Sequence, residues 1–290
     1  MTDQPIIPRR SVLFMPAANE RALEKAKTLA CDAVIFDLED AVAPAMKDDA
    51  RDKAAAAVAS GAYGRRERIM RINGLETAWW KEDVLAAAGA GPDAVLIPKV
   101  ESAAAIQQVA AVMDAAGASS IKIWAMLETP MAYLRAEEIA AASDKVTCFV
   151  IGTNDLVKDL HAKHTKTREP VITALGMAML VARAYKLTIL DGVYNDFRNT
   201  EGLAVECQQA ADMGFDGKTL IHPAQIDIAN EVFAPDEGAT RQAEKLIAAF
   251  DEAKAEGKGV AVLDGKMVED LHVAEARRTL AIAKAIASVG

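Results

Sequence analysis

The sequence predicts a (β/α)8 TIM barrel followed by a C-terminal helical appendage. Short runs of Val, Ile and Leu recur about every 25 to 35 residues, and nearly every gap between them has the apolar spacing of an amphipathic helix. The runs are mostly apolar on both faces, which is typical of parallel strands that are covered by helices. Together these two observations indicate a repeated strand–helix unit.

Eight runs qualify as strands: Ser11–Met15, Ala33–Asp37, Arg68–Ile72, Ala94–Pro98, Ile121–Leu127, Val146–Ile151, Leu187–Leu190 and Lys218–Ile221. Eight units that end by about residue 232 suffice to close a barrel. An open doubly wound sheet would need a nucleotide-binding fingerprint or a switch point, and the chain has neither a GxGxxG sequence nor a Walker loop.

Capping residues support the helices between the strands. Asn19 can cap the first helix, and Pro44 suits the first turn of the second. Ser102 can cap a helix that Gly117 ends, with a buried stripe at Ile106, Val109, Ala110 and Met113.

We therefore assign residues 1–232 to the barrel and residues 233–290 to a C-terminal helical extension. The extension contains a charged helix over 239–255, a turn with two glycines, a strand-like piece over 260–263 and a last helix that ends near Val289. The apolar positions of the last helix need a surface to cover them. The extension could be a clasp on the same barrel, a lid or an arm that packs on another subunit. Because a neighbouring subunit could supply the surface, we expect a homo-oligomer.

Charge and cysteine usage exclude several classes of protein. The chain has 33 basic and 42 acidic residues and a net charge of −9, which argues against a nucleic-acid partner. Cys31, Cys148 and Cys207 form no metal-binding or disulfide pattern. No run reaches the ~18 apolar residues of a membrane span, and no signal segment is visible. We expect a cytoplasmic protein without a membrane partner.

Polar side chains follow seven of the eight strands. The carboxyl ends of barrel strands share one rim, so these residues are expected to form one site. They include Asp37, Glu39 and Asp40 at the end of the second strand, and then, at the ends of later strands, Arg71, Asn73, Lys99, Glu128, Asn154, Asp155, Asp191 and His222. Asp37 and Asp191 are the members most suited to holding loops by hydrogen bonds.

Glu128 and Asp155 follow adjacent strands and have no nearby Cys or His pair. Such hard oxygen ligands favour Mg²⁺, with Mn²⁺ as an alternative. The open coordination positions suit a 2-oxo acid, and Glu39 and Asp40 would hold metal-bound waters. A glycosidase-type acid and base pair is the alternative, but only 5% of the residues are aromatic.

Three further side chains are candidates for the chemistry. Arg71 offers a fork for a carboxylate or a developing enolate, although a salt bridge to Glu39 or Asp37 is an alternative role. Lys99 could form a Schiff base in a metal-free aldolase. His222 could act as a base or as a hydrogen-bonding loop residue.

The chain resembles the citrate lyase β-subunit-like family, which includes malyl-CoA and citramalyl-CoA lyases, in the HpcH/HpaI aldolase superfamily. The similarity runs nearly end to end. It is carried by Arg10-Ser11-Val12-Leu13-Phe14-Met15-Pro16, Phe36-Asp37-Leu38-Glu39-Asp40-Ala41-Val42, Arg71-Ile72-Asn73, Leu96-Ile97-Pro98-Lys99, Glu128-Thr129, Gly152-Thr153-Asn154-Asp155-Leu156 and Ile221-His222-Pro223.

The resemblance implies a role for each matching residue. Glu128 and Asp155 would bind the metal, Arg71 would contact the thioester or its enolate, and Glu39 and Asp40 would hold metal waters. Phe14 and Lys25 lie where the family contacts coenzyme A, and Asn19 replaces an arginine that binds coenzyme A in some members. Asn154, Ile221 and His222 complete the expected substrate contacts.

A tail motif that resembles Met-Ile-Asp reads Met267-Val268-Glu269 here. In many family members its Asp completes the active site of a neighbouring subunit. Glu269 keeps the carboxylate on a longer side chain, so the resemblance implies a catalytic Glu269 in a trimer or hexamer. The alternative is a solvated acidic start to the final helix.

The implied reaction is Mg²⁺-dependent C–C cleavage of a 3-hydroxyacyl-CoA, of the malyl-CoA or citramalyl-CoA type, to acetyl- or propionyl-CoA and a 2-oxo acid. A malyl-CoA thioesterase with the same site is one alternative. An aldolase that acts on small hydroxy-oxo acids is another. A citrate lyase-type subunit that acts on an acyl carrier protein within a complex is a third.

Overall fold

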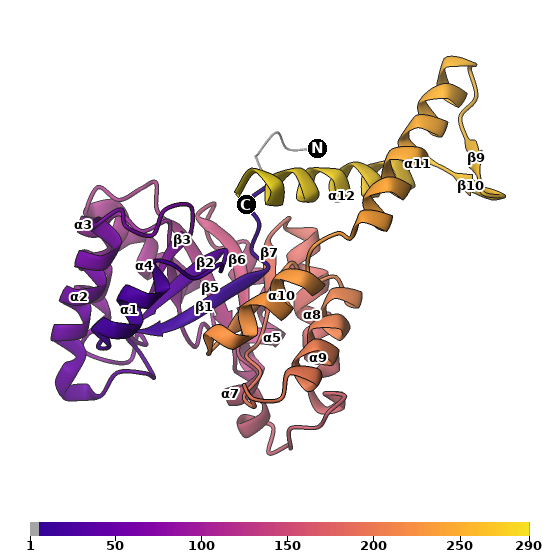
Figure 1. The fold of residues 1–290 in the computed structure, drawn as a ribbon. Helices are drawn as coiled ribbons and strands as arrows, with labels where there is room; N and C mark the ends of the chain where they lie inside the picture. Colours follow the sequence, from indigo (N-terminus) through magenta and orange to yellow (C-terminus); the bar gives the residue numbers. More distant parts are fainter. Residues whose placement is uncertain (1–5, 290) are drawn as a thin grey trace. The chain divides into compact units, whose positions relative to one another are not determined.

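The computed structural model describes residues 6–289, in two compact units. The larger comprises Arg9–Glu231. The smaller comprises residues 232–289 together with residues 6–8. Figure 1 colours the chain from indigo at the N-terminus to yellow at the C-terminus. No helix in the described chain combines the length and the apolar character needed to cross a bilayer.

Eight parallel strands close the larger unit into a barrel in sequence order, with β1 paired to both β2 and β8. The predicted (β/α)8 fold is therefore confirmed, and β2 and β6 have the predicted bounds. The strands are β1 (Ser11–Pro16), β2 (Ala33–Asp37), β3 (Glu67–Arg71), β4 (Ala94–Ile97), β5 (Lys122–Leu127), β6 (Val146–Ile151), β7 (Thr188–Asp191) and β8 (Gly217–Leu220).

Helices connect these strands around the barrel (Figure 1). They are α1 (Glu20–Ala26), the 3₁₀ turn η1 (Pro44–Met46), α2 (Lys47–Ala59), α3 (Trp80–Ala90), α4 (Ala103–Ala115), α5 (Pro130–Leu134), α6 (Ala136–Ala140), α7 (Thr153–Asp159), α8 (Glu169–Ala184), α9 (Thr200–Asp212), the 3₁₀ turn η2 (Pro223–Gln225) and α10 (Ile226–Val232).

The expected caps are present. The side chain of Asn19 accepts a hydrogen bond from the Ala22 N–H, and that of Ser102 accepts one from the Ala105 N–H. Gly117 follows α4 with a φ of +77°, a conformation that favours glycine at the end of a helix.

Alternate residues of the strands fill the inside of the barrel with one apolar cluster. It consists of Val12, Ala33, Ile35, Ile69, Ala94, Leu96, Trp124, Met126, Cys148, Val150 and Leu190. The guanidinium of Arg9 lies 5.1 Å from the centre of the Trp124 ring and pairs with Glu67. Because these side chains fill the inside of the barrel, a binding site can form only at the carboxyl ends of the strands.

The smaller unit contains α11 (Glu237–Ala255), β9 (Ala261–Leu263), β10 (Lys266–Val268) and α12 (Asp270–Val289). The two strands form an antiparallel hairpin. Asp264 and Gly265 form its turn with φ angles of +50° and +74°, as a two-residue turn of this kind requires. Phe250, Ala253, Ala261, Val268 and Val273 form a core of its own.

Candidate active site

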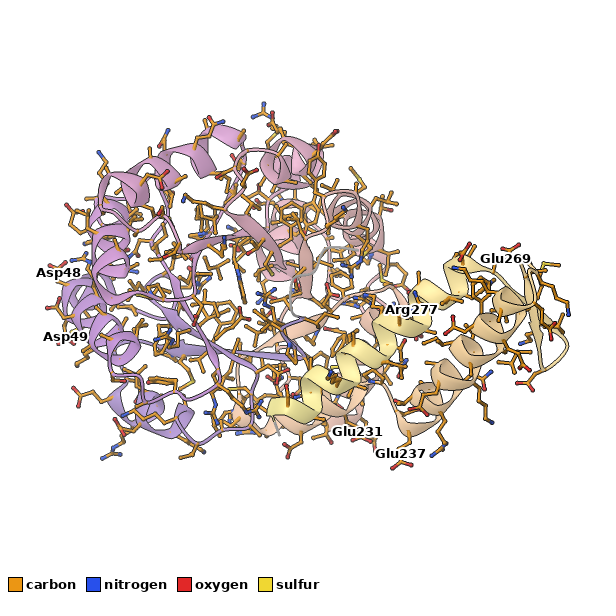
Figure 2. The ribbon with its side chains drawn as sticks, turned by 90° about the horizontal axis from the view of Figure 1, so that it is seen from above. Asp48, Asp49, Glu231, Glu237, Glu269 and Arg277 are labelled. Carbon is orange, nitrogen blue, oxygen red and sulfur yellow. The ribbon has the colours of Figure 1, made fainter. Side chains whose placement is uncertain are left out.

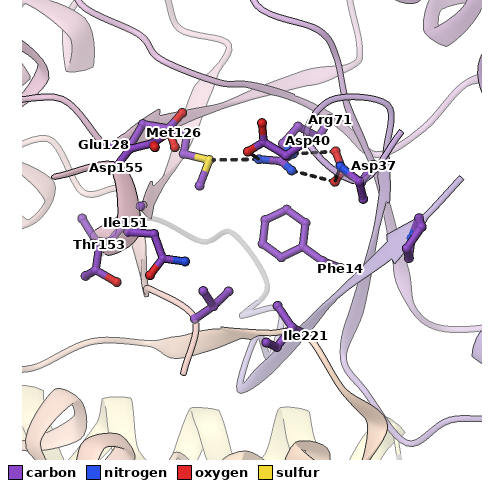
Figure 3. A pocket seen from close by; sticks show the side chains of 15 residues that line it. Phe14, Asp37, Asp40, Arg71, Met126, Glu128, Ile151, Thr153, Asp155 and Ile221 are labelled. Carbon is purple, nitrogen blue, oxygen red and sulfur yellow. Dashed lines mark hydrogen bonds and ion pairs between the residues drawn. The ribbon is translucent and has the colours of Figure 1, made fainter. Parts of the chain in front are cut away.

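A cavity of about 400 Å³ opens at the carboxyl ends of the barrel strands (Figure 3). Its size falls in the range of small-molecule sites. Residues from β1, β2, β3, β5 and β6 and from the loops after β2, β5, β6, β7 and β8 line it: Phe14, Pro16, Asp37, Asp40, Ala41, Arg71, Met126, Glu128, Ile151, Gly152, Thr153, Asn154, Asp155, Val193 and Ile221. Polar groups that are far apart in the sequence thus meet at one site.

Glu128 follows β5 and is only 3% exposed. Its Oε1 accepts a hydrogen bond of 2.7 Å from the Lys99 N–H. Burial and the nearby charge of Glu39 raise the pKa of Glu128 to about 7. A bound cation would stabilise the charged form of this buried carboxylate.

Gly152 leaves room for this carboxylate at the end of β6. A Cβ at position 152 would lie 2.4 Å from the Cβ of Glu128 and 2.8 Å from its Oε2. Any larger residue would therefore displace Glu128 or the strand end. The glycine is required for close approach and not for a positive φ.

Asp155 lies in the first turn of α7, and its side chain is 29% exposed. It lines the same cavity as Glu128, and Figure 3 shows the two on one side of it. Among residues 6–289, no group of three or more His, Cys, Asp or Glu side chains is arranged around a metal position. Two carboxylates in a partly open cavity fit Mg²⁺, which keeps several waters or substrate oxygens as ligands.

Arg71 is a positive group that lines the same cavity as this acidic pair. Its Nε and Nη2 donate to the two oxygens of Asp37 at 2.7 and 2.6 Å, and its Nη1 lies 2.8 Å from Glu39 Oε2. The guanidinium also stacks over Phe14, with 4.9 Å from Cζ to the ring centre. The salt bridges considered from the sequence are formed, and Arg71 still lines the cavity.

Glu39 and Asp40 take different positions. Glu39 is buried between Arg71 and the ammonium of Lys99, which donates to its Oε1. Asp40 lines the cavity and its side chain is 65% exposed. Burial raises the pKa of Glu39, although Arg71 and Lys99 oppose the shift.

The ammonium of Lys47 fixes the loop that carries these two residues. It donates to the carbonyl oxygens of Leu38 and Glu39, both at 2.7 Å, and is itself buried. Nothing in the sequence distinguishes this lysine from others on α2. Asn73 is likewise held at the end of β3, where its backbone and side-chain N–H groups donate to Asp83.

The predicted substrate contacts divide between the cavity and its surroundings. Phe14, Asn154 and Ile221 line the cavity. Asn154 exchanges two amide hydrogen bonds with Asn195, which ties the loop after β7 to the rim. His222 stacks on Phe197 with 4.5 Å between ring centres, and its Nδ1 accepts from the Ala224 N–H.

The other predicted residues lie outside the cavity. Asn19 lines a second, shallow hollow that shares Pro16 and Ala41 with the cavity. Lys25 is exposed on α1. Asp191 pairs with Arg168 and Lys218 and does not line the cavity, as its expected loop-holding role requires.

Glu269 lies in the smaller unit, between β10 and α12, and is exposed (Figure 2). Its N–H donates to His272 Nδ1 at 3.0 Å. The catalytic role of its carboxylate stays a prediction.

A parallel barrel with an acidic pair and an arginine at its carboxyl rim is the arrangement expected of an enzyme active site. Residues 10–223 match the family model described as HpcH/HpaI aldolase/citrate lyase. The chain belongs to this family.

Two curated relatives have nearly the same length as this chain. A (3S)-malyl-CoA thioesterase of Cereibacter sphaeroides is 52% identical over 283 residues, which cover 98% of this chain and 97% of the relative. The citrate lyase subunit beta of Leuconostoc mesenteroides subsp. cremoris is 34% identical over 283 residues, with 96% and 94% covered.

The fold also matches a solved structure of protein CitE from Mycobacterium tuberculosis in complex with magnesium, acetoacetate and coenzyme A. The TM-score is 0.78 at 30% identity, and the match covers 94% of this chain and 97% of that one. The expected family and fold are thereby confirmed.

Proposed function

We propose that the protein is a Mg²⁺-dependent thioesterase that hydrolyses a malyl-CoA-type thioester to free CoA and a hydroxy dicarboxylic acid. The observation that carries the proposal is the 52% identity, over nearly the whole chain, to a (3S)-malyl-CoA thioesterase. The sequence resemblance favoured C–C cleavage. The comparison supports hydrolysis, its alternative, better.

Glu128 and Asp155 are the residues that would hold Mg²⁺. They are oxygen donors beside one cavity. Burial and the nearby charge of Glu39 raise the pKa of Glu128, so a bound cation would stabilise its charged form. Bound there, Mg²⁺ would supply a Lewis acid and a template for the hydroxyl and carboxylate oxygens of the malyl group.

Arg71 would stabilise the thioester oxygen. Asp37 holds its guanidinium with two hydrogen bonds, so the group needs little reorganisation during the reaction. When water adds to the thioester carbonyl carbon, negative charge develops on that oxygen. The C–S bond then breaks, CoA leaves as the thiol after protonation, and the acyl group becomes a carboxylate.

The attacking water needs a base. We assign this role to Glu269 of the partner subunit in a homo-oligomer. Support comes from the exposed carboxylate and from the apolar side chains exposed around it, Val262, Met267 and Leu271. Such side chains favour contact with another protein surface.

Incubation of the purified protein with Mg²⁺ and (3S)-malyl-CoA tests the proposal. Free thiol and malate should accumulate together, as measured by a thiol reagent and by mass spectrometry. A sample without protein serves as the control for nonenzymatic hydrolysis, and Arg71→Lys protein should give slower release of both products. Acetyl-CoA and glyoxylate as the main products would overturn the proposal.

C–C cleavage remains the second candidate, because citrate lyase β subunits also align over nearly their whole length. The same residues would serve it. Arg71 would then stabilise the thioester enolate that forms when the bond to the 2-oxo acid breaks, and a proton would be added to give acetyl- or propionyl-CoA.

A further inference from the structure

Lys99 lies at the centre of the carboxylates of the site, although it does not line the cavity. Its Nζ donates to Glu39 and lies 4.0 Å from both Asp40 Oδ1 and Asp155 Oδ2. Its backbone N–H binds Glu128. One residue therefore contacts or faces four acidic side chains.

The backbone at this position supports a functional reason for the arrangement. Lys99 has a φ of +48°, in the left-handed region that a residue with a long side chain rarely adopts. Such strain persists where the surrounding contacts impose it, and it is common at functional sites. Here it accompanies the hydrogen bond that orients the predicted metal ligand Glu128.

We propose that Lys99 is a positioning residue that acts as the built-in counter-ion of this cluster, and that its ammonium, 4.0 Å from Asp155, opposes the binding of a divalent cation at Glu128 and Asp155. The inference rests on the metal site in the proposed function. Without a cation, the ammonium offsets the repulsion among Glu39, Asp40 and Asp155. With a cation bound, two positive groups share the cluster and repel each other.

The repulsion gives an unusual expectation: removing the lysine should strengthen metal binding. Lys99→Gly and Lys99→Gln should each bind Mg²⁺ roughly tenfold more tightly than the wild type by isothermal titration calorimetry. Lys99→Gly also accepts the positive φ without strain, so it is the variant best suited to fold. Lys99→Arg keeps the charge and should stay close to the wild type.

Lys122→Gln is the matched control. Lys122 is exposed at the first residue of β5, whereas Glu128 follows the last residue of that strand. Its loss changes the net charge equally but should leave Mg²⁺ affinity unchanged.

Thermal denaturation gives a second readout, which, like calorimetry, does not depend on catalysis. At one subsaturating Mg²⁺ concentration, the rise in Tm on adding metal should be larger for Lys99→Gly than for the wild type, because stabilisation by a ligand grows with its affinity. Equal or weaker Mg²⁺ binding in both neutral variants would overturn the counter-ion role. A wild type that binds no Mg²⁺ would instead refute the metal site itself.

Discussion

Arg71 and Asp37 form a buried ion pair through two parallel hydrogen bonds, of 2.7 and 2.6 Å, at the carboxyl ends of β3 and β2. The sheet register places these two residues directly opposite each other. The pair fixes the guanidinium beside Phe14 and the cavity. Arg71 can therefore serve both the structure and the reaction.

Substitution of this arginine should separate the two roles. Arg71→Lys keeps a positive charge but loses the planar fork, so kcat should fall by roughly 10²–10³-fold, the scale for loss of one aligned donor. Steady-state kinetics and urea denaturation of the same protein give the two measurements. A loss of stability with kcat unchanged would assign Arg71 a structural role only.

Asp37 provides the complementary test. Asp37→Asn leaves the buried guanidinium without its main partner, which should lower the free energy of unfolding by about 3–5 kcal/mol. Denaturation curves measure this change. If the variant is as stable as the wild type, the ion pair does not hold the rim together.

Metal removal should abolish activity. We expect no turnover in excess EDTA and full recovery with Mg²⁺ or Mn²⁺, while Glu128→Gln and Asp155→Asn should weaken Mg²⁺ binding without unfolding the barrel. Full activity with the chelator present, together with borohydride trapping of substrate on Lys99, would instead support a Schiff base.

Gly152 gives a test of the geometry around Glu128. Gly152→Ala places a Cβ against that side chain, so Mg²⁺ affinity should fall by about 10- to 100-fold, as for other residues that support metal ligands. Gly176→Ala is the matched control. A Cβ there meets no atom within 4 Å in the middle of α8, so this change should add up to about 1 kcal/mol of stability.

The raised pKa of Glu128 predicts a pH-dependent stability. A carboxyl group whose pKa is higher in the folded than in the unfolded protein stabilises the fold at low pH, and this contribution is lost as the pH rises through about 7. In EDTA, Glu128→Gln should therefore gain stability relative to the wild type between pH 5 and pH 8, on the order of 1.4 kcal/mol per unit of pKa shift. Parallel pH profiles for the two proteins would contradict the shift.

Mixed oligomers can test Glu269. Glu269→Gln and Glu128→Gln protomers, each inactive alone, should recover part of the activity after subunit exchange, because some sites would then contain both intact residues. The absence of recovery after verified exchange, or an active monomer, would rule out a shared site.

The sequence predicted the barrel well because its strands are apolar runs buried on both sides, a local property that needs no knowledge of contacts. The hairpin of the smaller unit was missed in part, although Asp264-Gly265 between short apolar runs is a turn signal. The length of the second run, Lys266–Val268, gave little support for a strand.

The sequence predicted which residues gather at the site but not the contacts between their side chains. The rim position of Glu128, Asp155 and Arg71 follows from barrel topology alone. The positioning of Lys99 and Lys47 depends on side chains that cross between loops, and no spacing in the sequence encodes those contacts.

The fate of water during turnover tests the central claim most directly. With (3S)-malyl-CoA and Mg²⁺ in H₂¹⁸O, hydrolysis should yield free CoA and malate that carries one ¹⁸O in the carboxylate formed from the thioester, as measured by mass spectrometry. Acetyl-CoA formed together with glyoxylate, without labelled malate, would contradict the thioesterase and support C–C cleavage.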